Sequence, residues 1–187
     1  MHYLTIDGVI RKLWKAHAAD YANHLLRLDP ISRRNRFGGT VADAFLRHHA
    51  DSAFDHGSVI YGFFADGVLR GAAELRPFGV RQAEAAFSVE RYWQSHGVGT
   101  ELLERALLAA RNRGVKQLHI TCLLENQRMQ QLAGKFDADM HRDFDSVVGE
   151  VEAPYPTPLS VLREIIADGT GLATACLDAQ WRMLRRA

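Results

Sequence analysis

The chain has few of the features that mark secreted, membrane-spanning or nucleic-acid-binding proteins. Its 187 residues include two cysteines, Cys122 and Cys176, which are far apart and favour a reducing compartment without structural disulfides. No apolar run approaches the roughly 18 residues of a membrane span, and Met1–Tyr3 opens neither a signal nor a transit peptide. A net charge of +1 gives no field that favours nucleic acid or an acidic membrane. We therefore expect a cytoplasmic protein that binds neither.

The sequence also lacks the ligand spacing of a metal site. It has nine histidines, but His48, His49 and His56 have no carboxylate or thiolate partners at zinc spacing, and the others are scattered. Apolar residues make up 47% and charged residues 24% of the chain, which is the composition of an ordinary globular domain. We expect no metal, and one hydrophobic core of normal size.

The stretch 83–136 predicts a strand, a glycine turn, a helix, a second strand and a further helix. The apolar run Ala85–Val89 precedes the turn Gln94–Thr100, and apolar residues then recur at helical spacing over Val98–Arg113. The short apolar segment Gln117–Leu124 is rich in strand formers and predicts a buried strand. A strand, a helix and a strand in this order form a crossover between two parallel strands.

The glycine turn is typical of an anion-binding cradle. Gly97 and Gly99 lack a Cβ, so the backbone can turn tightly and come close to a ligand. The N–H groups at the start of the following helix point at whatever lies there, and the helix dipole favours negative charge. A pyrophosphate fits this description. A glycine-turned crossover that binds no nucleotide is the alternative.

Two other glycine motifs fit the turn poorly. A dinucleotide-binding fingerprint requires a third glycine and an acidic residue at the tip of the next strand, and that strand ends in Leu123-Leu124-Glu125-Asn126. A Walker A loop requires Gly-Lys-Ser/Thr, which is absent from the sequence.

The residues of this stretch resemble those of the GNAT N-acetyltransferases. Gln94-x-x-Gly97-x-Gly99 is similar to their Arg/Gln-x-x-Gly-x-Gly/Ala signature, whose loop binds the pyrophosphate of acetyl-CoA. The segment Glu84–Val89 precedes it as their fourth strand does, and Asn126–Phe136 follows it like their asparagine-led helix. The resemblance covers residues 58–152 and is closest to bacterial members related to protein lysine acetyltransferases.

The resemblance implies an α/β (α+β) fold with a mixed, mostly antiparallel sheet of six to seven strands and helices on both faces. Within it, Asp66-Gly67 predicts a hairpin between 59–65 and 68–76, because both turn positions tolerate positive φ. Met140–Phe144 and Val147–Val151 predict a second hairpin around Asp145-Ser146.

We expect one acetyltransferase domain over residues 1–152, with its core at 58–152, and a helical extension over 153–187. In the extension, Thr157 predicts the cap of a helix over Leu159–Ile166 that Gly169 and Gly171 break before a last helix, Leu172–Leu184. The apolar residues of the extension predict packing on the domain or on a partner chain, which makes a homodimer possible.

The first forty residues are expected to hold a strand at Val9–Lys15, a helix at Asp20–Leu28 closed by Asp29-Pro30, and a basic loop at Ser32–Thr40. Thr40 would cap a helix over Val41–His49. By analogy with the family, the loop arginines (Arg33, Arg34 and Arg36) would meet an acidic substrate or a CoA phosphate. The alternative is that they are solvated or pair with Asp43 or Asp51.

The resemblance implies that acetyl-CoA is the co-substrate and a primary amine the acceptor, either a protein lysine or a small molecule. It assigns to acetyl-CoA the residues Phe87, Val89, Gln94, Ser95, His96, Gly97, Val98, Gly99, Thr100, Asn126 and Met129. For Asn126, a helix cap is the alternative role. Catalysis would use Glu84 as the general base and a backbone N–H at Ser88, on the strand Phe87–Val89, for the oxyanion.

One departure from the family pattern concerns the departing thiolate. Many members have a tyrosine seven residues after the helix-opening asparagine, and this chain has Ala133 there. The predicted function is acetyl transfer to the amine by direct attack in a ternary complex. The alternative is a non-catalytic acyl-CoA-binding module. For Glu84 the alternative is a solvated strand-end residue, or one paired with Arg81 or Arg91, and Cys122 is either a thiol near the acetyl group or a small core residue.

Overall fold

The computed structural model describes residues 8–55 and 57–184, with the backbone alone for residues 172 and 174–184. The strands are β1 (Val9–Leu13), β2 (Val59–Ala65), β3 (Val68–Phe78), β4 (Gln82–Val89), β5 (Gln117–Leu123), β6 (Asp139–Asp143) and β7 (Ser146–Glu152). The α-helices are α1 (Ala18–Arg27), α2 (Pro30–Phe37), α3 (Asp43–Ser52), α4 (Val98–Asn112), α5 (Gln127–Gly134) and α6 (Pro158–Leu184). Short 3₁₀ turns lie at Lys15–His17 and Arg91–Trp93.

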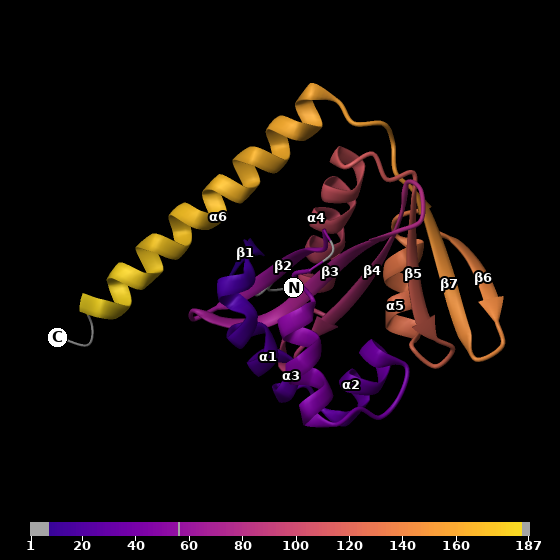
Figure 1. The fold of residues 1–187 in the computed structure, drawn as a ribbon, viewed down its shortest axis with the longest axis horizontal. Coiled ribbons are helices and arrows are strands. Elements are labelled where there is room, and N and C mark those ends of the chain that lie inside the picture. Colours follow the sequence, from indigo (N-terminus) through magenta and orange to yellow (C-terminus); the bar gives the residue numbers. More distant parts are fainter. Residues whose placement is uncertain (1–7, 56, 185–187) are drawn as a thin grey trace, which may run out of the picture.

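The strands form one seven-stranded sheet in the order β1-β2-β3-β4-β5-β7-β6 (Figure 1). Every neighbouring pair is antiparallel except β4 and β5, which are parallel. The predicted mixed sheet and its parallel crossover are therefore confirmed. The helix of the crossover is α4. It ends just before Gly114, which has the left-handed conformation with φ 71°.

Helices cover both faces of the sheet (Figure 1). On one face, Leu25 of α1 and Leu46 of α3 pack with Ala72 of β3 in a buried cluster. On the other face, Leu102 of α4 packs with Ala73 in a second cluster, which also includes residues of α5. Ala72 and Ala73 are consecutive strand residues, so their side chains point to opposite faces, and β3 carries part of both cores.

Both predicted hairpins form. Asp66 and Gly67 have φ angles of 51° and 72°, as a two-residue hairpin turn requires, and they join β2 to β3. The second hairpin turns one position earlier than predicted, because Asp143 pairs with Ser146 and leaves Phe144-Asp145 in the turn. Phe144 takes the positive φ of 36° in that turn.

The predicted basic loop at residues 32–40 is wrong, because most of it is helix α2. Asp29 caps α2 by accepting hydrogen bonds from the N–H groups of Ile31 and Ser32 at 3.0 and 3.1 Å. Pro30 occupies the first turn, and Gly38 ends the helix in the left-handed conformation at φ 74°. Asp29-Pro30 is thus the start of a helix and not only the end of the previous one.

The next helix boundary also differs from the prediction. Helix α3 begins at Asp43, after Ala42 at the N-cap position, where no side chain caps the helix. Thr40 is therefore not a helix cap. The carboxylate of Asp43 lies in the first turn, where the helix dipole favours negative charge.

The C-terminal extension contains one helix, and the predicted break at Gly169 and Gly171 is wrong. A Cβ at Gly171 would lie 3.0 Å from the carbonyl oxygen of Ile10 and 3.0 Å from Cβ of Arg11, so this glycine lets α6 approach β1 closely. The predicted cap is confirmed: the Ser160 N–H donates to Oγ1 of Thr157, and the Thr157 N–H donates to Oγ of Ser160.

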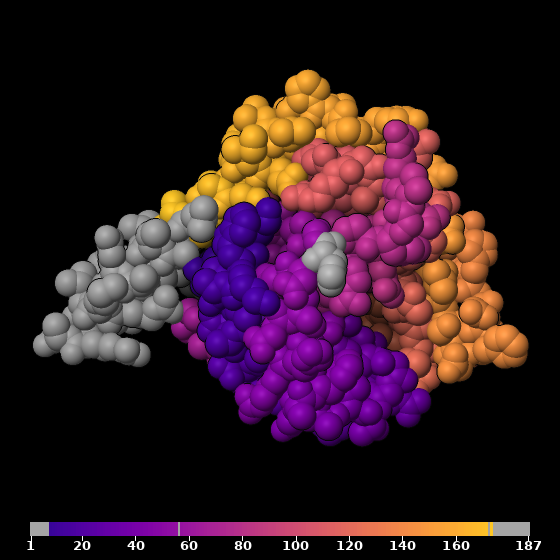
Figure 2. All heavy atoms as spheres, viewed as in Figure 1, coloured from indigo at the N-terminus to yellow at the C-terminus, as the bar shows by residue number. Residues whose placement is uncertain are grey.

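Figure 2 shows the first half of α6 lying across the end of α4. Ion pairs hold it there: Arg113 with Glu164 at 2.7 Å and Arg105 with Asp168 at 3.0 Å. The predictions for Met1–Tyr3 and for the side chains from residue 174 onward lie outside the described part of the chain, and contact with a partner chain stays a prediction. In the described ranges, no helix is long and apolar enough to cross a membrane.

The two glycines of α6 predict opposite effects of substitution. Gly171→Val should lower the free energy of unfolding by about 1–3 kcal/mol, because the added atoms overlap the backbone of β1. Gly169→Ala should raise it by up to about 1 kcal/mol, because a Cβ at Gly169 meets no atom within 4 Å and alanine is the better helix former. Urea unfolding measures both changes. Equal effects of the two substitutions would contradict the close approach of α6 to β1.

Candidate active site

The central feature of the site is the divergence of β4 from β5. Their parallel ladder covers only Gln82–Glu84 on β4 and Gln117–His119 on β5. Over the same length β4 stays paired with β3, and β5 stays paired with β7. Beyond Glu84 and His119, the backbone groups on the facing edges of the two strands therefore do not hydrogen-bond across from β4 to β5. Such groups need another partner where they are buried.

The register of β4 identifies which amides face this opening. The Glu90 N–H donates to the Arg70 carbonyl at 2.9 Å, so Glu90 points its backbone groups toward β3. Backbone groups alternate from one strand residue to the next, so the N–H of Ser88 also points toward β3, while those of Phe87 and Val89 point toward β5. Of these three residues, Phe87 and Val89 therefore present an N–H to the opening, and Ser88, whose N–H we predicted as the oxyanion donor, does not.

Helix α4 begins at the open end of this divergence. Ser95 and Gly97 have φ angles of 63° and 92°, which turn the chain sharply into the helix. The earliest helical donors are the N–H groups of Thr100 and Glu101, both to the Gly97 carbonyl, so the N–H groups before them lie outside the helical ladder. A Cβ at Gly97 would meet no described atom within 4 Å, so the backbone surface there is open.

Other residues assigned to acetyl-CoA hold the turn in place. The Gln94 side chain donates to the Val89 carbonyl at 2.8 Å and to Oγ of Ser32 at 3.0 Å, and it accepts from Arg128. It thus ties the turn to β4, α2 and α5. Asn126 caps α5 by accepting from the Met129 N–H at 3.3 Å.

The remaining predicted residues divide between the core and the surface. The side chains of Phe87, Val89, Val98 and Met129 belong to the cluster under α4. His96 is exposed and lies beside the Tyr92 ring, with ring centroids 6.4 Å apart.

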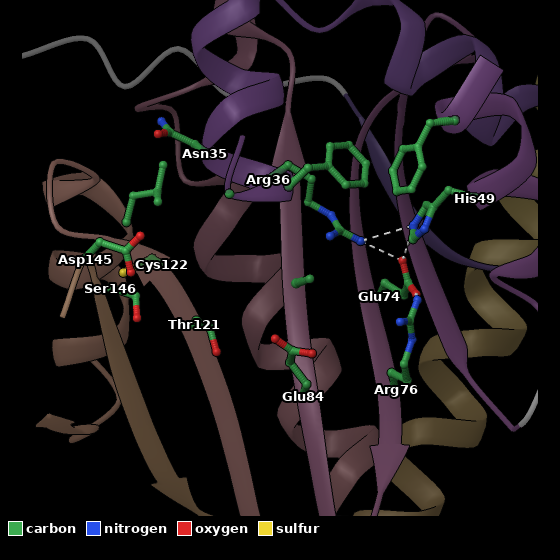
Figure 3. A pocket seen from close by; sticks show the side chains of 15 residues that line it. Asn35, Arg36, His49, Glu74, Arg76, Glu84, Thr121, Cys122, Asp145 and Ser146 are labelled. Carbon is green, nitrogen blue, oxygen red and sulfur yellow. Dashed lines mark hydrogen bonds and ion pairs between the residues drawn. The ribbon is translucent and has the colours of Figure 1, made fainter. Parts of the chain in front are cut away.

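Glu84 lies at the closed end of the divergence. It is the last β4 residue in the ladder with β5, and on the other side it is the register partner of Arg76 in β3. Glu84 is half-buried and forms no hydrogen bond or ion pair with any described residue, so the pairing with Arg81 or Arg91 that we considered is not found. Its carboxylate faces a cavity of about 400 Å³ (Figure 3).

Three groups of elements surround this cavity. Residues of β4 and β5 form its floor, the β6–β7 turn forms one side, and α2, α3 and β3 form the other (Figure 3). The lining residues with polar side chains are Asn35, Arg36, His49, Glu74, Arg76, Glu84, Thr121, Cys122, Asp145 and Ser146. Of these, Glu84 was predicted as a catalytic residue, and Arg36 and Cys122 were considered as alternatives for a substrate, phosphate or acetyl contact.

Glu74 is the most heavily bonded carboxylate in the cavity wall. It is 2% exposed, and its oxygens accept from Arg36 and Arg76, each at 2.6 Å, from His49 at 2.9 Å and from the Tyr21 hydroxyl at 3.1 Å. Burial alone would raise its pKa, but the bonds from His49 and Arg36 outweigh burial and lower the pKa of Glu74 to about 2. Glu74 is therefore ionised at neutral pH.

A second buried polar cluster fixes the end of β4 to α1. His24 is fully buried, with Nε2 2.9 Å from Oγ of Ser88 and Nδ1 3.3 Å from Glu90. Arg27 and Arg70 donate to the same Glu90 carboxylate at 2.8 and 2.9 Å. Burial lowers the pKa of His24, which favours the neutral ring. The Ser88 side chain is thus used for packing β4 against α1, on the opposite side from α4.

The sequence carries one signal for this cluster. His24 lies at helical spacing with Tyr21, Leu25 and Leu28, all of them buried, so the histidine shares the apolar face of α1. Glu74 gave no comparable signal, because Tyr21, Arg36 and His49 come from three helices that are distant from it in sequence.

Three further predicted residues have clear positions. Ala133 is buried, and a Cβ added to Gly149 would lie 3.5 Å from the Cβ of Ala133. Ala133 therefore packs between α5 and β7. Cys122 lines the cavity, and burial raises the pKa of its thiol, which disfavours a thiolate nucleophile. In the part of the chain that the structure describes, no three His, Cys, Asp or Glu residues are grouped as metal ligands.

Comparison with known proteins gives the family. The model of the acetyltransferase (GNAT) family matches residues 20–137. The chain belongs to the GNAT acetyltransferase family. The resemblance that we drew from Gln94, Gly97 and Gly99 is therefore confirmed, and acyl transfer is the activity that membership supports. No curated protein matches the sequence significantly.

Solved GNAT structures share the fold. The GNAT domain of S. lividans PAT is 19% identical, with a TM-score of 0.66 over 76% of this chain and 89% of that chain. PaiA N-acetyltransferase from Thermoplasma acidophilum, in complex with coenzyme A, is 16% identical, with a TM-score of 0.62 over 78% and 99%. The yncA protein of Salmonella typhimurium, with its cofactor acetyl-CoA, is 17% identical, with a TM-score of 0.61 over 80% and 96%.

The pKa of Glu74 predicts how acid affects this GNAT domain. Because the folded-state pKa of about 2 lies below the ordinary 4.5, the carboxylate stabilises the fold above about pH 4.5, and this contribution is lost as the pH falls toward 2. A shift of this size corresponds to about 3 kcal/mol. Glu74→Gln should therefore lower the free energy of unfolding by about that amount near neutral pH.

Urea unfolding at a series of pH values checks this prediction. The difference between wild type and Glu74→Gln should shrink as the pH is lowered through the acid range, since wild type loses the contribution that the variant lacks. Glu104→Gln, on the exposed face of α4, is the matched control and should follow wild type. A difference that is independent of pH would contradict the ionised state of Glu74.

Proposed function

We propose that this protein is an acetyl-CoA-dependent N-acetyltransferase that transfers the acetyl group to a primary amine by direct attack in a ternary complex. The observation that carries the proposal is the arrangement along β4: the strand diverges from β5, the N-terminus of α4 lies at the open end, and Glu84 lies at the closed end. Family membership and neighbours solved with coenzyme A or acetyl-CoA support it.

The residues of the opening fit acetyl-CoA as a substrate. The pyrophosphate would be held by the N–H groups that precede the α4 ladder, where Gly97 leaves the backbone open. The amide groups of the pantetheine arm can pair with the free edge of β4, as an added strand would. The thioester would then lie near Phe87 and Val89, whose N–H groups face β5.

The transfer requires three events at named groups. The carboxylate of Glu84 takes a proton from the acceptor ammonium, because only the free amine has a lone pair. The amine nitrogen then attacks the thioester carbon, and an N–H of Phe87 or Val89 stabilises the oxyanion. The C–S bond breaks as the acetamide forms, and the nitrogen gives up its remaining extra proton to water. Coenzyme A leaves as the thiolate or takes a proton from water, since Ala133 offers no acid.

The rival function is a non-catalytic acyl-CoA-binding module, and Ala133 at the usual tyrosine position is the feature that favours it. That module would bind acetyl-CoA without turnover. We also propose a cytoplasmic location, which the scarcity of cysteine supports. Both a protein lysine and a small amine are candidate acceptors at this stage.

Replacement of Glu84 separates the enzyme from the module. Glu84→Gln should lower kcat by about 10²- to 10⁴-fold, because the acceptor loses its base, while the affinity for acetyl-CoA stays unchanged. Thiol release with a panel of amines, beside calorimetric titration of acetyl-CoA, measures the two quantities. Glu104→Gln is the control for loss of a carboxylate. Wild-type binding without turnover would favour the module instead.

Replacement of Gly97 tests the cradle. Gly97→Glu should abolish acetyl-CoA binding, because the side chain enters the ligand space and its charge repels a pyrophosphate. Gly114→Glu is a matched control at the other end of α4, since Gly114 also has positive φ and open space at Cβ. Binding that survives in Gly97→Glu, with circular dichroism unchanged in both variants, would refute the cradle.

A further inference from the structure

The cavity beside Glu84 has charges of opposite sign on its walls. Glu84 on β4 and Asp145 in the β6–β7 turn are acidic, while Arg36 of α2 and Arg76 of β3 are basic (Figure 3). Glu84 and Arg76 are register partners on neighbouring strands, so their Cβ atoms are about 5 Å apart. An acidic and a basic group thus face the same space a short distance from one another.

Arg36 is a buried cation with unused donors. Its side chain is 9% exposed, and its Nη2 donates to Glu74 at 2.6 Å and lies 3.5 Å from Nε2 of His49. Its Nε is buried without an acceptor, and no hydrogen bond from its Nη1 is found among the described residues, although the Tyr21 hydroxyl also interacts with the guanidinium. At least the Nε donor is therefore uncommitted, and a buried donor without an acceptor is unfavourable. This indicates a ligand that supplies acceptor oxygens.

The other arginines of α2 do not share this property. Arg33 pairs with Asp43 at 2.7 Å and also donates to the carbonyls of Leu28 and Leu26. Arg34 is exposed and pairs with Glu125 at 2.6 Å. The alternatives that the sequence left open for the three arginines thus resolve differently for each, and Arg36 alone of the three lines the cavity.

Arg36 and Arg76 share one bonded carboxylate. Glu74 is the one carboxylate that bonds Arg36 and Arg76 in the described structure, so two guanidinium groups share a single negative charge. Arg76 is about half exposed and uses only Nη2 for Glu74. Glu84 also interacts with Arg36 through its charge, but it bonds neither guanidinium, so both keep donors for the oxygens of an anion.

We infer that the acetyl acceptor is a small primary amine that carries a carboxylate, as a free amino acid does, with its amine at Glu84 and its carboxylate at Arg36 and Arg76. The inference rests on the proposed function and narrows its acceptor. The short separation of Glu84 from Arg76 requires the amine and the carboxylate to be a few bonds apart. Planar guanidinium groups match a carboxylate, and the ligand oxygens would satisfy the unused donors of Arg36.

The test compares acceptors that differ only in this charge. Thiol release from acetyl-CoA is measured with the proteinogenic amino acids, with their α-carboxamides, with a neutral lysine-containing peptide and with phosphoethanolamine. The best amino acid should exceed its own carboxamide in kcat/KM by about 30-fold, as expected for loss of a charge-assisted hydrogen bond. It should also exceed the peptide and the phosphate ester.

Variants test whether Arg36 and Arg76 cause the preference for a carboxylate. Arg36→Gln should bring the ratio of acid to carboxamide close to one, and Arg76→Gln should lower the ratio in the same direction. Arg34→Gln, on the same helix, should keep the wild-type ratio. The ratio is measured on a single preparation, so a variant that is only partly folded still reports it.

The outcomes separate this inference from the proposed function. Equal rates for acids and carboxamides, or preference for the peptide or the phosphate ester, would overturn the carboxylate acceptor and leave acetyl transfer intact. A ratio that Arg36→Gln and Arg76→Gln do not change would also overturn it. Thiol release from none of these amines, with acetyl-CoA bound, would refute acetyl transfer and this inference together.

Discussion

The short parallel ladder between β4 and β5 is the constraint on which the site depends. Both strands keep their outer partners, so neither can bend back to close the gap beyond Glu84 and His119. The free edges face each other, and the crossover places the first turn of α4 at the open end. The backbone amides at the start of α4 and those on the free edge of β4 thus border one opening, and the groups that we propose they bind need no special side chain for each.

Two buried carboxylates fix α1, α2 and α3 to the face of the sheet opposite α4. Glu90 joins α1 to the end of β4 through His24 and Arg27, and Glu74 joins α2 and α3 to β3 through Arg36 and His49. Removal of Glu74 would leave the buried cation of Arg36 without its carboxylate, which costs several kcal/mol in measured cases. Removal of Glu90 would take the shared acceptor from Arg27 and Arg70. The helices that form one wall of the cavity are therefore fixed by charge as well as by apolar packing.

Local signals in the sequence were enough for the sheet and the crossover. Asp66-Gly67 determines a hairpin, and the glycines around residue 97 start a helix, because these effects act within a few residues. The errors came where one signal has two meanings. Asp29-Pro30 can end one helix or cap the next, and Gly171 can break a helix or let it pack closely on β1. The second meaning depends on a segment that is distant in sequence.

The candidate site, too, could be predicted from the sequence only in part. Glu84 and the Gly97 turn could be predicted, since they belong to one continuous stretch that resembles a family. The grouping of Arg36 and Arg76 around Glu74 could not be predicted. Arg36 meets Glu74 only when α2 packs on β3, and no spacing within the sequence links the two residues. The role of Ser88 also depends on register, since a strand that is shifted by one residue would reverse the direction of its N–H.

Calorimetric titration of the purified protein with acetyl-CoA, beside desulfo-CoA and NAD, tests the central claim most directly. The account predicts saturable binding of acetyl-CoA and of desulfo-CoA, because the cradle and the β4 edge recognise groups that both ligands share, and no binding of NAD. Absence of acetyl-CoA binding, or equal binding of NAD, would mean that the opening between β4 and β5 is not a coenzyme A site.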